Sequence, residues 1–322
     1  TGNNIQPLSV SPIKYMMGDT SIEITLDKET IDSNTIYSQS YKFYIPLHFW
    51  FCKNPGLALP LVALQNHDVE LIVEIEKEEN ININSGFGKI SNKDTVYVSH
   101  ISTSIDCKPC IDYIFLDTEE RKRFSQTSHE YLIEQLQINE NISIEGKSEN
   151  IFPLHFNHPV KELVWVSTVG VGTNGSHSTS SCDFVSLSNG TKDDAVVSLL
   201  FNGKERFTPR NMSYFTKVQP YIYHNNIPAQ NTVGVYSFSL NPENIEPSGS
   251  CNFSRLDNVR FIMNFTNQKN DGVILDIKNV DDKEAILPVY SQKDITGNLK
   301  VFAVNYNVLR IMSGMSGLAY MC

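Results

Sequence analysis

The sequence predicts an all-β protein built from two β-sandwiches in tandem, with a few short helices. Apolar and polar residues alternate along many short segments, and loops rich in Ser, Asn, Gly and Pro separate these segments. A sustained 3.6-residue period is almost absent. At 322 residues the chain is long enough for two domains of about 150 residues each. The polar segment 140–150 is the best linker, so the predicted domains are residues 1–149 and 150–322.

The segment 41–64, YKFYIPLHFWFCKNPGLALPLVAL, organises the first predicted domain. Its aromatic residues favour a pleated, half-buried strand. Asn54 followed by Pro55 is typical of a helix N-cap and first helical position, so we expect a short helical turn through residues 57–59 before the next strand. Prolines, a histidine and a lysine interrupt the segment, which excludes the roughly 20 clean apolar residues of a membrane span.

Other strands of the first half are predicted around this segment. Residues 21–26 alternate in a polar background and indicate an edge strand or a surface ribbon. Further strands are expected at residues 67–76, 95–101 and 110–116.

Two helix-capping signatures follow these strands. Asp117 and Glu120 resemble a capping box that opens a short charged helix ending near Phe124, and residues 127–130 repeat the signature. Residues 131–138, YLIEQLQI, are ambiguous between helix and strand. We favour a strand, because β-branched and apolar residues continue to residue 144.

The second half shows strand patterns at residues 162–168, 196–201, 235–240, 258–265, 272–277 and 300–311. A weak internal repeat relates the halves: the sequence around Val69 resembles that around Val259, and the sequence around Tyr113 resembles that around Tyr306. The separations are similar, 44 residues from Val69 to Tyr113 and 47 from Val259 to Tyr306. Two related sandwiches would produce this pattern, and so would chance.

The net charge and the cysteine content limit which partners the chain can bind and whether it contains disulfides. The formal net charge of −10 argues against direct nucleic-acid binding, which requires clustered Lys and Arg. It also disfavours anionic membrane surfaces. Six cysteines are too few for a disulfide scaffold in a chain of this length, so reduced and buried thiols are expected.

Three short motifs have a structural explanation that outweighs the functional one. Residues 170–175, GVGTNG, match a dinucleotide fingerprint, but the following SHSTSSCD is a poor helix former and cannot supply the helix N-terminus that binds pyrophosphate. Cys107 and Cys110 lack the second pair of a zinc ribbon and open a strand rather than a helix. His155 and His158 lack a third metal ligand.

The sequence therefore predicts a non-enzyme without cofactor or metal. None of the GxSxG, HExxH and Walker A patterns occurs. The sequons at Asn174 and Asn189 lie in a Ser- and Gly-rich segment and are candidate glycosylation sites. The alternative is a carbohydrate-binding or hydrolytic β-sandwich, which would need an aromatic platform or two converging carboxylates.

Five long segments resemble the major capsid proteins of nucleocytoplasmic large DNA viruses, the double jelly-roll type of iridoviruses, phycodnaviruses and mimivirus relatives. They occur in the family's order across nearly the whole chain: IPLHFWFCKNPGLALPLVAL (45–64), DYIFLDTEERKRFSQTSHEYLIEQLQ (112–137), FNHPVKELVWV (156–166), YSFSLNPENIEPSGSCNFSRLDNVRF (236–261) and VFAVNYNVLRIMSGMSGLAY (301–320).

The resemblance implies two jelly rolls, homotrimers that form pseudo-hexagonal capsomers, and contacts with neighbouring capsomers and minor capsid proteins. It implies a place in the virion shell, assembly in the cytoplasm of an infected cell, and an inner viral membrane nearby that the chain does not span. Family members carry strands before the counterpart of Tyr41 that this chain lacks in large part, so the first roll is expected to be incomplete.

The residues singled out are expected to pack a core and to have no catalytic role. In the first roll these are Phe43, Phe49, Trp50, Leu57, Leu61, Val69, Leu71 and Val73. In the second they are Leu163, Trp165, Phe238, Phe261, Val304, Tyr306, Val308 and Leu309. Because absent strands would cover Phe49, Trp50 and Phe51, these three rings are expected to be unusually exposed in this chain alone.

Overall fold

The computed structural model describes residues 7–9, 15–32, 35–74, 99–144, 149–169, 195–227, 231–264 and 297–320. The chain divides into two compact units. The first comprises residues 1–132 and 308–319, and the second comprises residues 133–307 and 320–322. Antiparallel strands dominate both units, so the predicted all-β class is confirmed.

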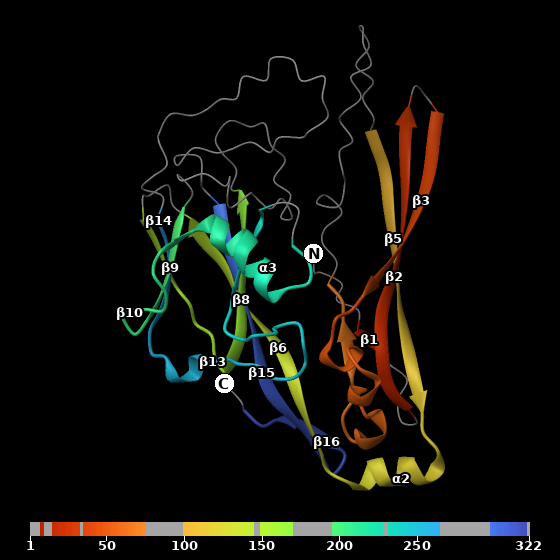
Figure 1. The fold of residues 1–322 in the computed structure, drawn as a ribbon. Coiled ribbons are helices and arrows are strands. Elements are labelled where there is room, and N and C mark those ends of the chain that lie inside the picture. The colour runs from red at the N-terminus through yellow and green to blue at the C-terminus, as the bar shows by residue number, and fades with distance from the viewer. Residues whose placement is uncertain are drawn as a thin grey trace. The chain divides into compact units, whose positions relative to one another are not determined.

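The first unit is built on a sheet of three long strands in the order β3-β2-β5 (Figure 1). These strands are β2 (Tyr15–Asp32), β3 (Thr35–Pro46) and β5 (Ser99–Phe115), and β1 (Pro7–Ser9) pairs separately with β4 (Glu70–Ile72). The prediction of an edge strand at residues 21–26 is wrong. These residues belong to β2, the central strand, which pairs with β3 on one side and with β5 on the other. Pro109 of the sequence CKPC lies on β5, at the edge of the described sheet, which is where sheets tolerate proline.

The segment after β3 forms three short 3₁₀ turns: η1 (Trp50–Cys52), η2 (Pro55–Leu57) and η3 (Leu61–Ala63). The predicted cap is confirmed, since Oδ1 of Asn54 accepts a hydrogen bond of 2.9 Å from the backbone N–H of Gly56. The helical turn expected at residues 57–59 lies slightly earlier, in η2, and the apolar run that follows forms η3. Pro55 and Pro60 have no N–H to donate to a sheet ladder.

The core of the first unit lies under these turns. Buried members are Met17, Phe51, Leu59, Leu61, Ala63, Leu64 and Ile311, and Trp50, Val69 and Leu309 pack against them while half-buried. Leu71 is also buried, whereas Leu57 and Val73 are partly exposed. The core assignment is wrong for Phe43 and Phe49, which are 50% and 36% exposed.

Phe43 is exposed because, within the described part of the chain, neither face of this part of β3 is covered, and its neighbours Tyr44 and Ile45 are 61% and 45% exposed as well. The expectation of unusual exposure fits Phe49 only. Phe51 stacks on Phe49 with ring centroids 5.1 Å apart and is itself buried, and Trp50 packs against Tyr131 at 5.5 Å.

The helix α2 (Thr118–Gln126) begins where its capping box predicts. Oδ1 of Asp117 accepts a 2.8 Å hydrogen bond from the N–H of Glu120. The repeated signature does not start a helix. Thr127 instead ends α2, since its hydroxyl donates to the carbonyl of Arg123 at 2.9 Å, and β6 (His129–Ile144) follows. The choice of strand for residues 131–138 is confirmed.

The described strands of the second unit lie in two antiparallel sheets. One has the order β10-β9-β14-β7, with β11 on β9, and the other has the order β12-β8-β15-β16, with β13 on β8 and β6 on β15. The strands are β7 (Glu149–Pro153), β8 (Pro159–Val169), β9 (Val196–Phe201), β10 (Lys204–Glu205), β11 (Arg210–Asn211), β12 (Val233–Ser237), β13 (Cys251–Asn252), β14 (Val259–Asn264), β15 (Gly297–Met312) and β16 (Met315–Leu318). The predicted strand at residues 272–277 lies outside the described residues.

Short helical elements complete this unit. They are the π-helical turn η4 (Tyr214–Val218), α3 (Gln219–Tyr223) and the 3₁₀ turn η5 (Phe253–Arg255). Gln219 links α3 to a strand, because its Oε1 accepts a hydrogen bond of 3.2 Å from the N–H of Ser237 at the end of β12.

The core of the second unit packs side chains of one sheet against those of the other. Trp165 of β8 is 1% exposed, and its ring meets that of Phe261 of β14 edge to face at 5.0 Å. Inward-facing residues alternate along β7, β9 and β14, as expected for sandwich strands. Of the other core residues predicted for the second roll, Leu163 and Tyr306 are buried, and Phe238 and Val304 are partly exposed. Val308 is also partly exposed and, like Leu309, belongs to the first unit.

Candidate functional site

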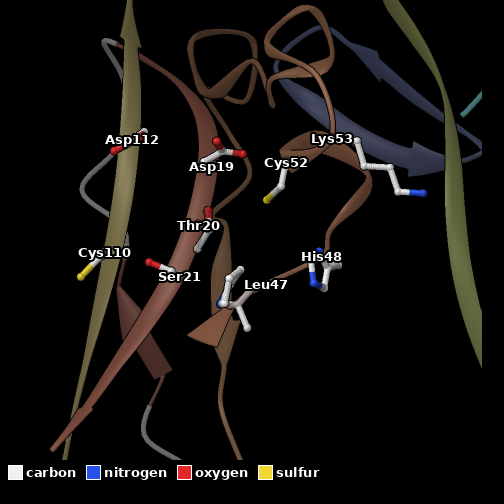
Figure 2. A pocket seen from close by; sticks show the side chains of 10 residues that line it. Asp19, Thr20, Ser21, Leu47, His48, Cys52, Lys53, Cys110 and Asp112 are labelled. Atoms are coloured by element: carbon white, nitrogen blue, oxygen red, sulfur yellow. The ribbon is translucent and has the colours of Figure 1, made fainter. Parts of the chain in front are cut away.

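A shallow hollow of about 370 Å³ lies in the first unit, beside the end of β3 (Figure 2). Polar and charged residues line most of it: Asp19, Thr20, Ser21, Pro46, Leu47, His48, Cys52, Lys53, Cys110 and Asp112. These side chains come from β2, β5 and the chain that follows β3. The hollow therefore offers the residue types from which a catalytic site could be built.

The side chains of the hollow do not form a reactive arrangement. The hydroxyl of Thr20 donates to the carbonyl of Gly18 at 3.1 Å, and the thiol of Cys52 contacts the same oxygen at 3.7 Å. Figure 2 shows Cys110 and Lys53 pointing away from one another on opposite sides. The two hydrogen-bonding contacts to Gly18 account for Thr20 and Cys52 as structural residues.

The two cysteines of the sequence CKPC do not assemble into a site. Cys107 and Cys110 lie three residues apart on β5, and a spacing of three on a strand places side chains on opposite faces. Burial raises the pKa of Cys107, as does the charge of Asp106, and both disfavour a reactive thiolate. Among the residues that the structure describes, no three His, Cys, Asp or Glu side chains could hold a metal ion.

His158 has a backbone role next to the exposed His155. Its φ of 65° is left-handed, its N–H donates to Oγ of Ser254 at 2.8 Å, and its carbonyl accepts from the N–H of Phe253 at 3.0 Å. The segment GVGTNG and the sequons at Asn174 and Asn189 lie outside the described residues.

The second unit contains a buried cation. Lys161 of β8 is 2% exposed, and its Nζ donates to Oε1 of Glu134 and, at 2.5 Å, to the carbonyl of Pro242. The ammonium also lies 5.7 Å from the ring centre of Tyr306. These partners compensate the desolvation of the charge, which would otherwise exclude a lysine from a sheet interior.

A histidine lies between two carboxylates in the same unit. Nε2 of His224 is 3.2 Å from Oε2 of Glu162, and Nδ1 is 3.3 Å from Oε1 of Glu243. Asn225 donates to Glu243 from its backbone N–H at 3.0 Å and from its side-chain amide. Two carboxylates thus converge, as a glycosidase would require, but Glu243 is hydrogen-bonded by Asn225 and Glu162 faces the ring of His224.

Two apolar residues of β6 face outward, whereas its Ile133 is buried. Leu136 and Ile138 are 57% and 46% exposed on one face. On the other face, Gln135 accepts from Nδ2 of Asn307 and Gln137 donates to Oδ1 of Asn305, both at 2.9 Å. We call Leu136 and Ile138 the β6 outer face. Sequence reasoning missed it, because alternation identifies two faces but not which of them is buried.

Within the described part of the chain, every helix is too short or too polar to cross a bilayer.

Two family models match consecutive parts of the chain. The model described as "Major capsid protein N-terminus" matches residues 14–117, and "Large eukaryotic DNA virus major capsid protein" matches residues 120–317. The major capsid protein of Pyramimonas orientalis virus is 39% identical over 303 residues, which cover 87% of this chain and 62% of that protein. The major capsid protein of Paramecium bursaria Chlorella virus 1 is 36% identical and is matched over 68% of its length, with 89% of this chain covered.

A solved structure supports the same assignment. A chain of the PBCV-1 virus capsid superposes with a TM-score of 0.70 and 26% sequence identity, over 99% of this chain and 93% of that chain. The paired antiparallel sheets are thus those of a double jelly-roll protein. The resemblance carried by five segments of the sequence is confirmed. The chain belongs to the family of large eukaryotic DNA virus major capsid proteins.

Proposed function

We propose that this chain is the structural subunit of a virion shell and that it acts by associating with copies of itself, not by catalysis. Three copies form a homotrimer, trimers serve as pseudo-hexagonal capsomers, and minor capsid proteins bind between them. The observation that supports this most is the agreement with the PBCV-1 capsid chain over 99% of the residues. The assembly takes place in an infected cell, and the shell encloses the viral membrane without spanning it.

The β6 outer face is our candidate for a contact between copies. Exposed apolar side chains that adjoin one another mark interaction surfaces more often than chance positions do. On one face of β6, Gln135 and Gln137 bond to the buried Asn307 and Asn305, and on the other Glu134 binds Lys161, so that Leu136 and Ile138 beyond it are left exposed. These two apolar side chains are left for a partner, and in a shell made of many copies that partner is a second copy.

Native mass spectrometry of the chain tests the association. We expect a species of three times 36.4 kDa. In the double variant Leu136→Asp, Ile138→Asp the trimer should be lost while the far-UV circular dichroism is kept, because the interface would have to bury two unpaired carboxylates.

A matched control is Lys204→Glu on β10, which changes the net charge by the same two units at an exposed polar position. It should remain trimeric. A wild-type chain that stays monomeric at all concentrations would contradict the proposed function. A double variant that still forms trimers would remove the β6 outer face from the interface and leave the association itself standing.

A carbohydrate-binding or hydrolytic sandwich is the second class considered. The carboxylates that converge in the second unit, Glu162 and Glu243, contact His224 and Asn225. In the hollow of Figure 2, the thiol of Cys52 and the hydroxyl of Thr20 are directed to the carbonyl of Gly18. Neither arrangement favours this alternative.

A further inference from the structure

His224 stands at a junction of three elements in the second unit. It directly follows α3, and its own N–H closes that helix by donating to the carbonyl of Pro220 at 2.9 Å. Its ring reaches Glu162 on β8 and Glu243 in the chain between β12 and β13. We propose that His224 is a charge clasp, in which a doubly protonated ring ties the end of α3 to β8 and to the Glu243 segment, and that the clasp opens as pH rises.

The geometry requires the charged ring. Each ring nitrogen faces a carboxylate oxygen, at 3.2 Å for Nε2 and 3.3 Å for Nδ1. A neutral imidazole has one N–H and one lone pair, so one nitrogen would direct its lone pair at an anionic oxygen. Only the imidazolium presents a donor to both.

Burial increases the cost of the neutral ring. Nε2 of His224 and Oε2 of Glu162 are both shielded from solvent, and their contact is an ion pair without the alignment of a hydrogen bond. If the ring lost its charge, these two atoms would keep no favourable partner within the described contacts. A buried polar atom in that state costs free energy.

The other charged and titratable groups on the elements that meet here do not replace the two carboxylates. Lys161 on β8 is bound by Glu134 and the carbonyl of Pro242, and Tyr306 lies beside that ammonium. The remaining groups are Lys217, Tyr221 and Tyr223 on the η4–α3 segment, Tyr236 on β12 and Glu246 beyond Glu243. None of these makes a contact with the ring comparable to those of Glu162 and Glu243.

The pH range follows from the sign of the shift. The close contact with Glu162 is the largest cause that raises the pKa of His224 above 6.5, Glu243 adds to it, and burial opposes both. A histidine whose pKa is higher in the folded state stabilises the fold fully below its unfolded pKa, and this stabilisation is lost as pH rises through the folded value. The clasp is therefore closed below about pH 6.5 and opens above it.

Opening of the His224 clasp affects the surface formed by α3 and the residues that follow it. The clasped segment carries exposed apolar side chains, with Tyr221 and Ile222 being 74% and 55% exposed and Ile227 lying just beyond the clasp at 47%. Gln219 still anchors the start of α3 to β12. The residues from α3 to Ile227 thus gain mobility at higher pH, and any contact that these side chains make becomes pH-dependent.

Hydrogen–deuterium exchange of the full chain between about pH 6 and pH 8.5, corrected for the intrinsic rate, tests the clasp. Peptides that cover residues 219–227 and 241–246 should lose protection as pH rises. In His224→Gln they should be unprotected at both ends of the range, with no pH dependence. The exposed His155, changed to Gln, is the matched control and should behave as wild type.

Two results would overturn the proposal. One is the same pH dependence in wild type and in His224→Gln. The other comes from a proton NMR titration of the histidine Cε1–H signals, in which His224 is expected to titrate above pH 6.5 and to move lower in Glu243→Gln. A midpoint at or below 6.5 in wild type would mean that the ring is not held in its charged form.

Discussion

Single residues far apart in the sequence define the core of the second unit. Trp165 on β8 pairs with Gly234 on β12, and a Cβ at residue 234 would lie 2.3 Å from the indole ring. Glycine is therefore required there by close packing and not by a turn. The indole of Trp165 occupies the space that a Cβ at residue 234 would need, and it packs against Phe261 of the facing sheet.

The change Gly234→Ala should destabilise the protein by about 1–3 kcal/mol, since overpacking outweighs the smaller gain of about 0.4–1 kcal/mol from a less flexible unfolded chain. Urea unfolding followed by tryptophan fluorescence would measure it as a lower midpoint with an unchanged slope. Gly317→Ala is the control, because no atom lies within 4 Å of a Cβ at that position. Equal midpoints for the two variants would contradict the packing argument.

At the scale of elements, local chemistry decided the helix and tertiary contacts decided the strands. Asp117 starts α2 through one hydrogen bond to the N–H of Glu120, as the capping box predicts. The apolar run at residues 60–64 has the composition of a strand yet forms a 3₁₀ turn. Its neighbour Leu59 makes the bridge to β2 instead, by exchanging two hydrogen bonds of 2.9 Å with Met17.

The cap of α2 can be tested by amide exchange. Asp117→Ala should destabilise the first turn of the helix by about 1 kcal/mol, which is roughly a fivefold faster exchange of residues 118–126. Asp117→Asn keeps an oxygen acceptor and should remain close to wild type. If both variants exchange equally fast, the negative charge at the helix N-terminus matters more than the hydrogen bond.

At the scale of the whole molecule, the charge of −10 opposes the approach of identical copies. Like charges on two subunits repel over distances set by the Debye length, about 10 Å at 0.1 M salt. Burial of apolar side chains such as those of the β6 outer face works against this repulsion. The proposed association of copies therefore depends on the salt concentration.

We expect the fraction of trimer to rise when ionic strength increases from about 0.02 M to about 0.2 M, since the Debye length shortens over this range. Sedimentation velocity at fixed protein concentration would measure it. The variant Lys204→Glu, with two more negative charge units, should need more salt for the same fraction. A trimer that dissociates as salt is added would indicate that attractive ion pairs dominate the interface.

Much of the fold and of the family assignment could be predicted from the sequence, because strand alternation, caps and long family-specific segments are local signals. The strands at residues 162–168, 196–201 and 300–311 and the cap at Asp117 were found in this way. The domain boundary near residue 150 stays a prediction, as do the glycosylation sites Asn174 and Asn189.

The candidate sites could be predicted less well, because they depend on which faces and which distant residues meet. Alternation along β6 was visible, but only the bonds of Gln135 and Gln137 to Asn307 and Asn305 show that its polar face is the inner one. Nothing local marks His224, whose two partners lie 62 residues before it and 19 residues after it. The sequence by itself determined an all-β fold of two sandwiches, since hydrophobic periodicity records burial along each strand, and its five long family-like segments indicated the capsid protein family. Only the tertiary structure decided where charges and exposed apolar side chains come together, because those contacts join residues that the chain keeps far apart.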